Sequence, residues 1–131
     1  MRVYLDSCLW IYAVEDPAGK GQGVLEQLLS GIESQDICLS HLIRMECLVE
    51  PIRSENAELV KQYENIWALG EVAELTRADF DLAARLRASF RLKTPDALHL
   101  AVAANNRCDE LWTNDSRLSA VATGVTVRRI Q

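Results

Sequence analysis

The residues from Thr94 to Ala104 predict a helix that has to lie inside the fold. The Thr94 hydroxyl can cap such a helix, and Pro95 suits its first position because proline lacks the N–H that would be unpaired there. From Ala97 to Ala104 every residue except His99 is apolar. A helix that is apolar on nearly all sides is typical of a protein interior. The sequence therefore predicts that this helix is buried.

Short apolar segments alternate with helical segments along the chain. Residues 2–6, 36–40, 72–75, 110–113 and 125–130 are predicted strands, and residues 7–14, 24–32, 41–49, 56–69 and 77–90 are predicted helices. Pro51 is expected to close the helix that begins at residue 41. Strands that alternate with helices favour an α/β fold with a mostly parallel sheet.

Length and composition predict a single domain, residues 1–131. The chain has 131 residues, of which 49% are hydrophobic, and this is enough for a real core. No apolar run approaches the roughly 20 residues that span a bilayer, and the first strand lacks the flanks of a signal peptide. We therefore expect a cytoplasmic protein with no membrane segment. The four cysteines form no C-x-x-C pair and are expected to be reduced, buried thiols.

The net charge of −5 opposes loose binding to phosphate backbones. It does not exclude an enzyme that acts on nucleic acid. Carboxylates that hold a metal ion count as negative in this sum but are offset once the cation is bound. The net charge therefore leaves the function open.

Four acids are placed at strand ends or early in helices. Asp6 ends the first predicted strand, Asp115 follows the strand at 110–113, Glu46 lies in the helix after the second strand, and Asp96 lies in the first turn of the buried helix. In an open parallel sheet, ligands bind beyond the carboxyl ends of the strands, so these acids are predicted to converge there. Each acid alone can also be interpreted as a cap, a turn former, a surface residue or a first-turn charge.

Taken together, the four acids indicate a metal site. Clustered carboxylates repel one another unless a cation compensates their charge. A ligand set made only of oxygens suits a hard cation, Mg²⁺ or Mn²⁺. Such an ion activates water and stabilises the charge that develops in phosphoryl transfer.

The chain resembles the PIN-domain nucleases, and most closely the VapC-type toxins of prokaryotic toxin–antitoxin pairs. The resemblance spans the whole chain in order and spacing, and four segments carry it: Val3–Ser7, Ser40–Glu46, Thr94–Ala101 and Leu111–Asp115. It implies a PIN-like three-layer α/β/α fold, with a short, mostly parallel sheet flanked by helices. It also implies a Mg²⁺- or Mn²⁺-dependent endoribonuclease that cleaves RNA, is commonly a homodimer, and is silenced by a cognate antitoxin.

The resemblance assigns roles to particular residues. Asp6, Glu46, Asp96 and Asp115 match the family's acidic quartet. Asp6 and Asp96 are expected to bind the metal directly, and Glu46 and Asp115 through water or a second ion. Ser7 and Thr113 match hydroxyl positions that orient the carboxylates.

His99 and three basic residues are further candidates. A lone histidine on an apolar helix is interpreted as a hydrogen-bonded core residue, and it can orient Asp96 or Glu46. Arg44, Lys93 and Arg117 adjoin the acids in sequence and are candidate phosphate contacts. Basic residues beside acids are also common as solvated surface partners.

Two alternative functions remain open at this stage. One is a catalytically weak or inactive PIN-like protein with an RNA-binding or regulatory role, although all four acids are present. The other is a metal-dependent phosphatase, which also places an acid after its first strand. A phosphatase with an aspartyl nucleophile requires the pattern Asp-x-Asp there. Position 8 of this chain is Cys, which argues against that function.

Overall fold

The fold is built on a five-stranded sheet in the order β3-β2-β1-β4-β5, and each pair of neighbouring strands is parallel. The computed structural model describes residues 1–30, 36–115, 117–118, 121 and 123–130. The strands are β1 (Arg2–Leu5), β2 (Asp36–Ser40), β3 (Glu71–Ala73), β4 (Glu110–Thr113) and β5 (Thr126–Arg129). The predicted strands and their parallel arrangement are therefore confirmed, with ends shifted by one or two residues.

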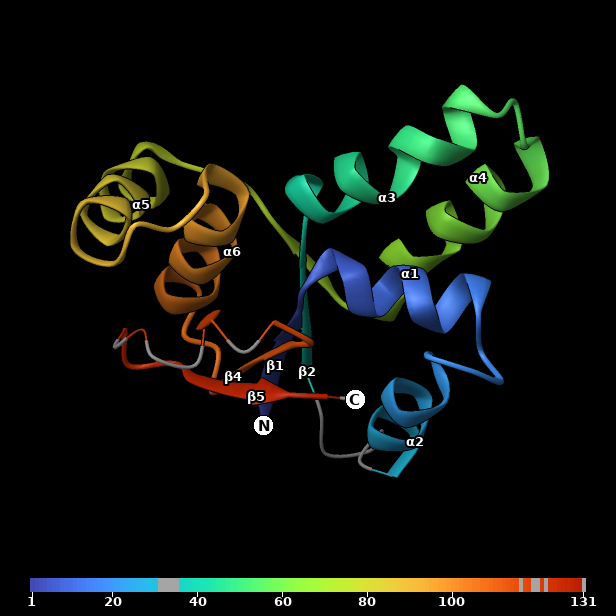
Figure 1. Ribbon diagram of the computed structural model, residues 1–131, viewed down its shortest axis with the longest axis horizontal. Helices are drawn as coiled ribbons and strands as arrows, with labels where there is room; N and C mark the ends of the chain where they lie inside the picture. Colours follow the sequence, from blue (N-terminus) through green and yellow to red (C-terminus); the bar gives the residue numbers. More distant parts are fainter. Residues whose placement is uncertain (31–35, 116, 119–120, 122, 131) are drawn as a thin grey trace.

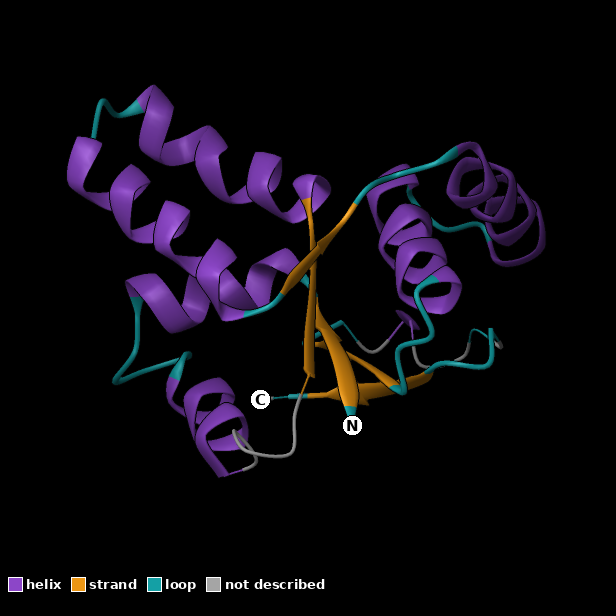
Figure 2. Cartoon of the chain, turned by 180° about the vertical axis from the view of Figure 1, so that it is seen from behind, coloured by secondary structure: helices purple, strands orange, loops and turns teal. Residues whose placement is uncertain are grey.

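Helices cover both faces of this sheet. They are α1 (Ser7–Glu15), α2 (Gln22–Ser30), α3 (His41–Arg53), α4 (Ala57–Glu64), the 3-10 helix η1 (Asn65–Leu69), α5 (Arg77–Phe90) and α6 (Thr94–Asn105). Helices α5 and α6 lie on one side of the strands, and α1 to α4 lie on the other (Figure 1; seen from behind in Figure 2). This is the three-layer α/β/α arrangement that the resemblance to the PIN-domain nucleases implies. Among the described residues, no helix is long and apolar enough to cross a membrane.

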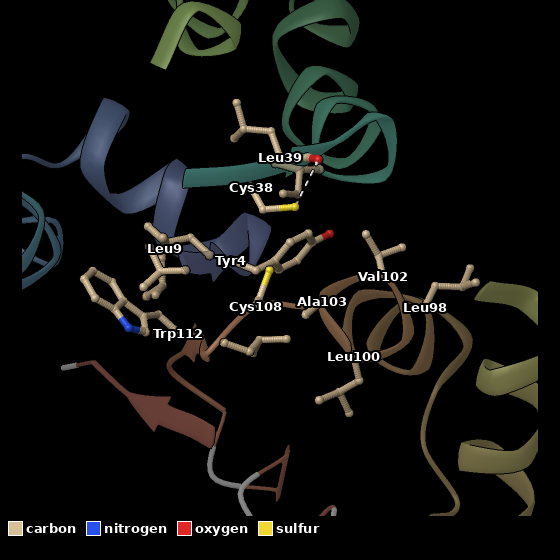
Figure 3. Packing of buried hydrophobic residues seen from close by; sticks show 14 of the residues in the cluster. Tyr4, Leu9, Cys38, Leu39, Leu98, Leu100, Val102, Ala103, Cys108 and Trp112 are labelled. Carbon is tan, nitrogen blue, oxygen red and sulfur yellow. Dashed lines mark hydrogen bonds between the residues drawn. The ribbon is translucent and has the colours of Figure 1, made fainter. Parts of the chain in front are cut away.

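The core lies between β1 and its covering helices. In β1, Val3, Tyr4 and Leu5 are fully buried, and α6 is buried continuously from Ala97 to Ala103. Figure 3 shows residues of α6 on one side of Tyr4, and Leu9 and Trp112 on the other. The prediction that the α6 segment is buried is confirmed.

Pro51 does not close α3, which continues to Arg53. Proline removes only its own N–H from the helix, and residues beyond it can still bond backwards. Here the backbone N–H of Ser54 donates to the Glu50 carbonyl over 2.9 Å, and Pro51 is buried. Burial of this residue helps to offset the missing bond.

The single helix predicted over residues 56–69 is divided into α4 and η1. Asn56 caps α4 by accepting from the backbone N–H of Leu59 over 3.1 Å. At the other end the chain must enter β3 through Gly70, whose backbone lies against β2. A Cβ added at Gly70 would lie 2.1 Å from the Ile37 carbonyl oxygen. The tighter 3-10 turns precede this close approach.

The start of α6 also differs from the prediction. Thr94 is the first helical residue and Lys93 is the N-cap, with no side-chain cap hydrogen bond. Pro95 is thus the second helical residue, where its missing N–H is still one of the four that a helix leaves unpaired. The last two residues of the second predicted helix, 31 and 32, lie outside the described residues.

Candidate active site

The carboxyl edge of the sheet gathers the predicted acids. Asp6 follows β1 directly, and Asp115 comes two residues after β4. Helix α6 runs antiparallel to the strands, because its end lies at the start of β1, where Arg2 Nε donates to the Asn106 carbonyl over 2.9 Å. Its first turn, with Asp96, therefore lies at the same edge as Asp6 and Asp115.

Asp6 is held by two hydroxyl groups. It occupies the N-cap position of α1, but its side chain makes no cap hydrogen bond. Its Oδ2 accepts from Thr113 Oγ1 over 2.9 Å, and its Oδ1 is 3.4 Å from Ser7 Oγ. Only 8% of the residue is exposed. The carboxylate is thus oriented toward the sheet edge instead of completing the helix terminus.

Glu46 is oriented by His99. The side chain of His99 is 1% exposed, and its Nε2 lies 2.5 Å from Glu46 Oε1. The other ring nitrogen, Nδ1, lies 2.6 Å from the Tyr4 hydroxyl, which in turn lies 2.8 Å from Ser40 Oγ. Because both ring nitrogens have hydrogen-bond partners, the orientation of the imidazole ring is fixed. The sequence offered Asp96 or Glu46 as the partner of His99, and in the structure His99 bonds to Glu46.

Ser7 links the two halves of this network. Its hydroxyl lies 3.2 Å from Glu46 Oε1 as well as near Asp6. Burial acts to raise the pKa of Glu46, but its hydrogen bonds with His99 and Ser7 and the attraction of His99 bring the pKa below its ordinary value. Glu46 is therefore a carboxylate at neutral pH, despite its partial burial.

Asp96 lacks such hydrogen-bond partners among the described residues. Its carboxylate forms no hydrogen bond or ion pair within the part of the chain that the structure describes. Burial, followed by the negative charges of Asp6 and Asp115, raises its pKa. Asp96 is thus near enough to Asp6 and to Asp115 for both charges to act on it, although the three residues come from separate parts of the sequence.

Asp115 is bound by Arg117. Arg117 Nε and Nη2 donate to both carboxylate oxygens, over 3.0 Å and 2.6 Å. These bonds lower the pKa of Asp115. The backbone N–H of Asp115 also donates to Thr113 Oγ1 over 3.1 Å, so Thr113 connects Asp115 with Asp6.

The basic candidates divide into two groups. Lys93 and Arg117 line a pocket of about 310 Å³ together with Asp96 and residues 90–92. Arg44 instead points to α4, where its Nη2 lies 2.7 Å from Glu64 Oε1. The structure thus brings Lys93 and Arg117 to the acids, and it does not bring Arg44 there.

The donor set at this edge is chemically suited to a hard cation, since it consists of carboxylate and hydroxyl oxygens. No group of three His, Cys, Asp or Glu side chains in the described ranges is arranged to hold a metal ion. The carboxylate oxygens of Asp96 and Asp6 nevertheless carry negative charge that a bound cation would neutralise. The residues fit a divalent ion by chemistry and charge.

Sequence reasoning missed Tyr4 and Ser40 as supporting residues of this site. Ser40 does cap α3, since its Oγ accepts from the backbone N–H of Ile43 over 3.3 Å. It also supports the Tyr4 hydroxyl, which burial keeps neutral by raising the pKa of the phenol. A tyrosine in a buried strand needs a partner for its hydroxyl, and this requirement was the available signal.

The fold and this edge identify the class of protein. Residues 3–124 match the PIN domain family, and the chain belongs to that family. No curated protein matches the chain.

Solved structures share the fold at low sequence identity. VapBC2 from Rickettsia felis, solved bound to a DNA fragment from its promoter, superposes with a TM-score of 0.83 at 14% identity and 100% coverage of both chains. A toxin–antitoxin complex from Klebsiella pneumoniae gives 0.73 at 21% identity, with 95% of each chain covered. VapC20 from Mycobacterium tuberculosis, a toxin that cleaves the sarcin–ricin loop, gives 0.67 at 14% identity, covering 95% of this chain and 98% of that one.

Proposed function

We propose that this protein is an endoribonuclease that depends on Mg²⁺ or Mn²⁺, and that it is the toxin of a type II toxin–antitoxin pair. The observation that carries the proposal is the meeting of Asp6, Asp96 and Asp115 at the carboxyl edge of the sheet. Asp96 is partly buried beside two like charges and has no hydrogen-bond partner in the described structure. An arrangement that destabilises a carboxylate in this way is typical of a cation site.

Asp6 and Asp96 are the proposed metal ligands, and Asp115 and Glu46 act through water or a second ion. When bound, the ion would lower the pKa of a coordinated water and offset the charge that develops on the phosphate. Thr113 and Ser7 hold the Asp6 carboxylate in place, and His99 does the same for Glu46. Glu46, which is held as a carboxylate, can accept a hydrogen bond from the attacking water and orient it.

Lys93 and Arg117 are the proposed contacts to the RNA backbone on the α6 side. Both line the pocket that contains Asp96, and the Arg117 guanidinium is largely exposed. An arginine can pair with phosphate as it does with a carboxylate. Arg117 can therefore exchange Asp115 for a phosphate when RNA binds.

The toxin role rests on the solved relatives. Several are complexes of a toxin with its antitoxin, and one is described as a toxin that cleaves the sarcin–ricin loop. We infer a cognate antitoxin for this chain, and a homodimer as its own assembly. Expression of this protein alone should arrest growth, and coexpression of a short gene from directly upstream should relieve the arrest.

Asp96→Asn tests the catalytic proposal. We expect Mn²⁺-dependent cleavage of purified single-stranded RNA to fall by more than about 100-fold. Loss of a residue that only supports a metal ligand costs about 10–100-fold, and loss of a ligand itself should cost more. Asp81→Asn is the matched control, because Asp81 is an exposed carboxylate on α5 whose pairing with Arg77 spans 3.7 Å. EDTA should abolish cleavage by the unmodified protein and by this control. Cleavage that survives in Asp96→Asn would show that the acidic site is wrongly assigned.

A further inference from the structure

A second pocket lies at the carboxyl edge of the sheet, and the proposed chemistry does not use it. It has a volume of about 370 Å³ and is lined by Tyr12, Lys20, Asn114, Arg129 and Ile130. Asn114 directly follows β4, and Arg129 is the last residue of β5, in register with Thr113. A pocket of this size has room for one nucleotide.

Two cations in this pocket have no acidic partner among the described residues. The Lys20 ammonium lies 5.4 Å from the centroid of the Tyr12 ring, which positions it at the pocket. Neither Lys20 nor Arg129 forms an ion pair in the described part of the chain, whereas the neighbouring Arg128 lies 3.8 Å from Glu110. Lys20 and Arg129 share this pocket without an ion pair in the described structure, although the chain has a net charge of −5. This indicates an anionic ligand.

Hydrogen bonds tie this pocket to the acidic site. Asn114 Nδ2 donates to the Tyr12 hydroxyl over 2.9 Å, and Cys8 Sγ donates to Asn114 Oδ1 over 3.0 Å. Asn114 lies between Thr113 and Asp115 in sequence, and Cys8 is two residues from Asp6. The pocket is therefore fixed relative to the acids, and it is distinct from the pocket that contains Asp96 and Lys93.

We propose that this pocket binds a nucleotide of single-stranded RNA next to the cleaved bond, with Lys20 and Arg129 neutralising its phosphate. The inference rests on the proposed ribonuclease function and extends it. Basic groups then lie in two pockets of the acidic edge, Lys93 and Arg117 in one and Lys20 and Arg129 in the other. Such an arrangement holds the phosphates of a strand while the carboxylates act between them. It also explains how a chain with a net negative charge can retain RNA.

The test is RNA binding by an Asp96→Asn protein, which should bind without cleaving. The anisotropy of a fluorescein-labelled single-stranded RNA of 12 nucleotides is measured over a range of KCl concentrations. Adding Lys20→Ala and Arg129→Ala should weaken binding about 10-fold at low salt and make the slope of log K against log[salt] shallower by roughly 1. Both side chains are exposed, so the variant should fold.

Lys61→Ala with Arg85→Ala is the matched control. It removes the same charge from exposed positions of α4 and α5, and it should leave both the affinity and the slope unchanged. RNA binding with an unchanged affinity and slope in the Lys20 and Arg129 variant would overturn the pocket and leave the ribonuclease proposal intact. A protein that neither binds nor cleaves RNA before the pocket is altered would overturn both.

Discussion

At the scale of single residues, hydrogen bonds distinguish structural from functional interpretations of an acid. Asp6 occupies a cap position, yet its carboxylate accepts from Thr113 and Ser7 and not from the helix backbone. Asp79 is the contrast, because its carboxylate accepts from the Thr76 backbone N–H and is absorbed into a helix terminus. From the sequence alone, Asp6 and Asp79 are both compatible with a role at a helix N-terminus. Only the direction of the side chain separates them.

Thr113→Val should impair catalysis without unfolding the protein. Thr113 is fully buried, and valine keeps its shape but removes the hydroxyl that donates to Asp6 and accepts from the Asp115 backbone. Loss of a residue that orients a metal ligand typically costs about 10–100-fold in metal affinity or activity. The measurement is kcat/KM for RNA cleavage together with the Kd for Mn²⁺. Thr113→Ser, which keeps the hydroxyl, should retain most of the activity; equal losses in both variants would contradict the role.

At the scale of elements, the position of Asp96 depends on how α5 holds α6. Asp79 in the first turn of α5 accepts from Thr76 and, with its other oxygen, from Asn105 Nδ2 at the end of α6 over 2.8 Å. One buried carboxylate thus caps one helix and joins it to the next. The bond between Asp79 and Asn105 links residues 26 apart, and no local pattern in the sequence predicts such a pairing.

Asp79→Ala should lower the free energy of unfolding by about 2–3 kcal/mol, because it removes a cap and leaves Asn105 without its partner. Chemical denaturation with the slope held in common gives this value. Asp81→Ala on the exposed side of the same helix should change stability by no more than about 0.5 kcal/mol. If the two variants lose the same stability, Asp79 does not join the helices.

At the scale of the whole molecule, the sequence predicted the strands, the parallel sheet and the edge where the acids meet. These follow from hydrophobic pattern and from the rule that parallel strands end together. It offered His99 as a partner of Asp96 or Glu46, but it did not predict that Ser40 and Tyr4 support His99 from behind. Nor did it predict the pocket at Lys20 and Arg129. Both depend on side chains from distant segments that become neighbours only when the layers pack. Lys20 lies in a glycine-rich segment, and its role depends on β5, more than 100 residues away.

The acidic edge should make the stability of the whole protein depend on divalent metal. Because burial and like charges raise the pKa of Asp96, ionisation of this carboxyl group costs the folded state stability. Mn²⁺ at 100 times its Kd should stabilise the fold by about 2.7 kcal/mol, a rise in Tm on the order of 5–10 °C. Asp96→Asn should have a higher Tm than the unmodified protein without metal, since one repelling charge is gone, and should lose most of the rise with Mn²⁺. Thermal unfolding measured with and without Mn²⁺ tests both expectations, and Asp81→Asn should respond to the metal like the unmodified protein. A full Mn²⁺ response in Asp96→Asn would place the bound ion elsewhere.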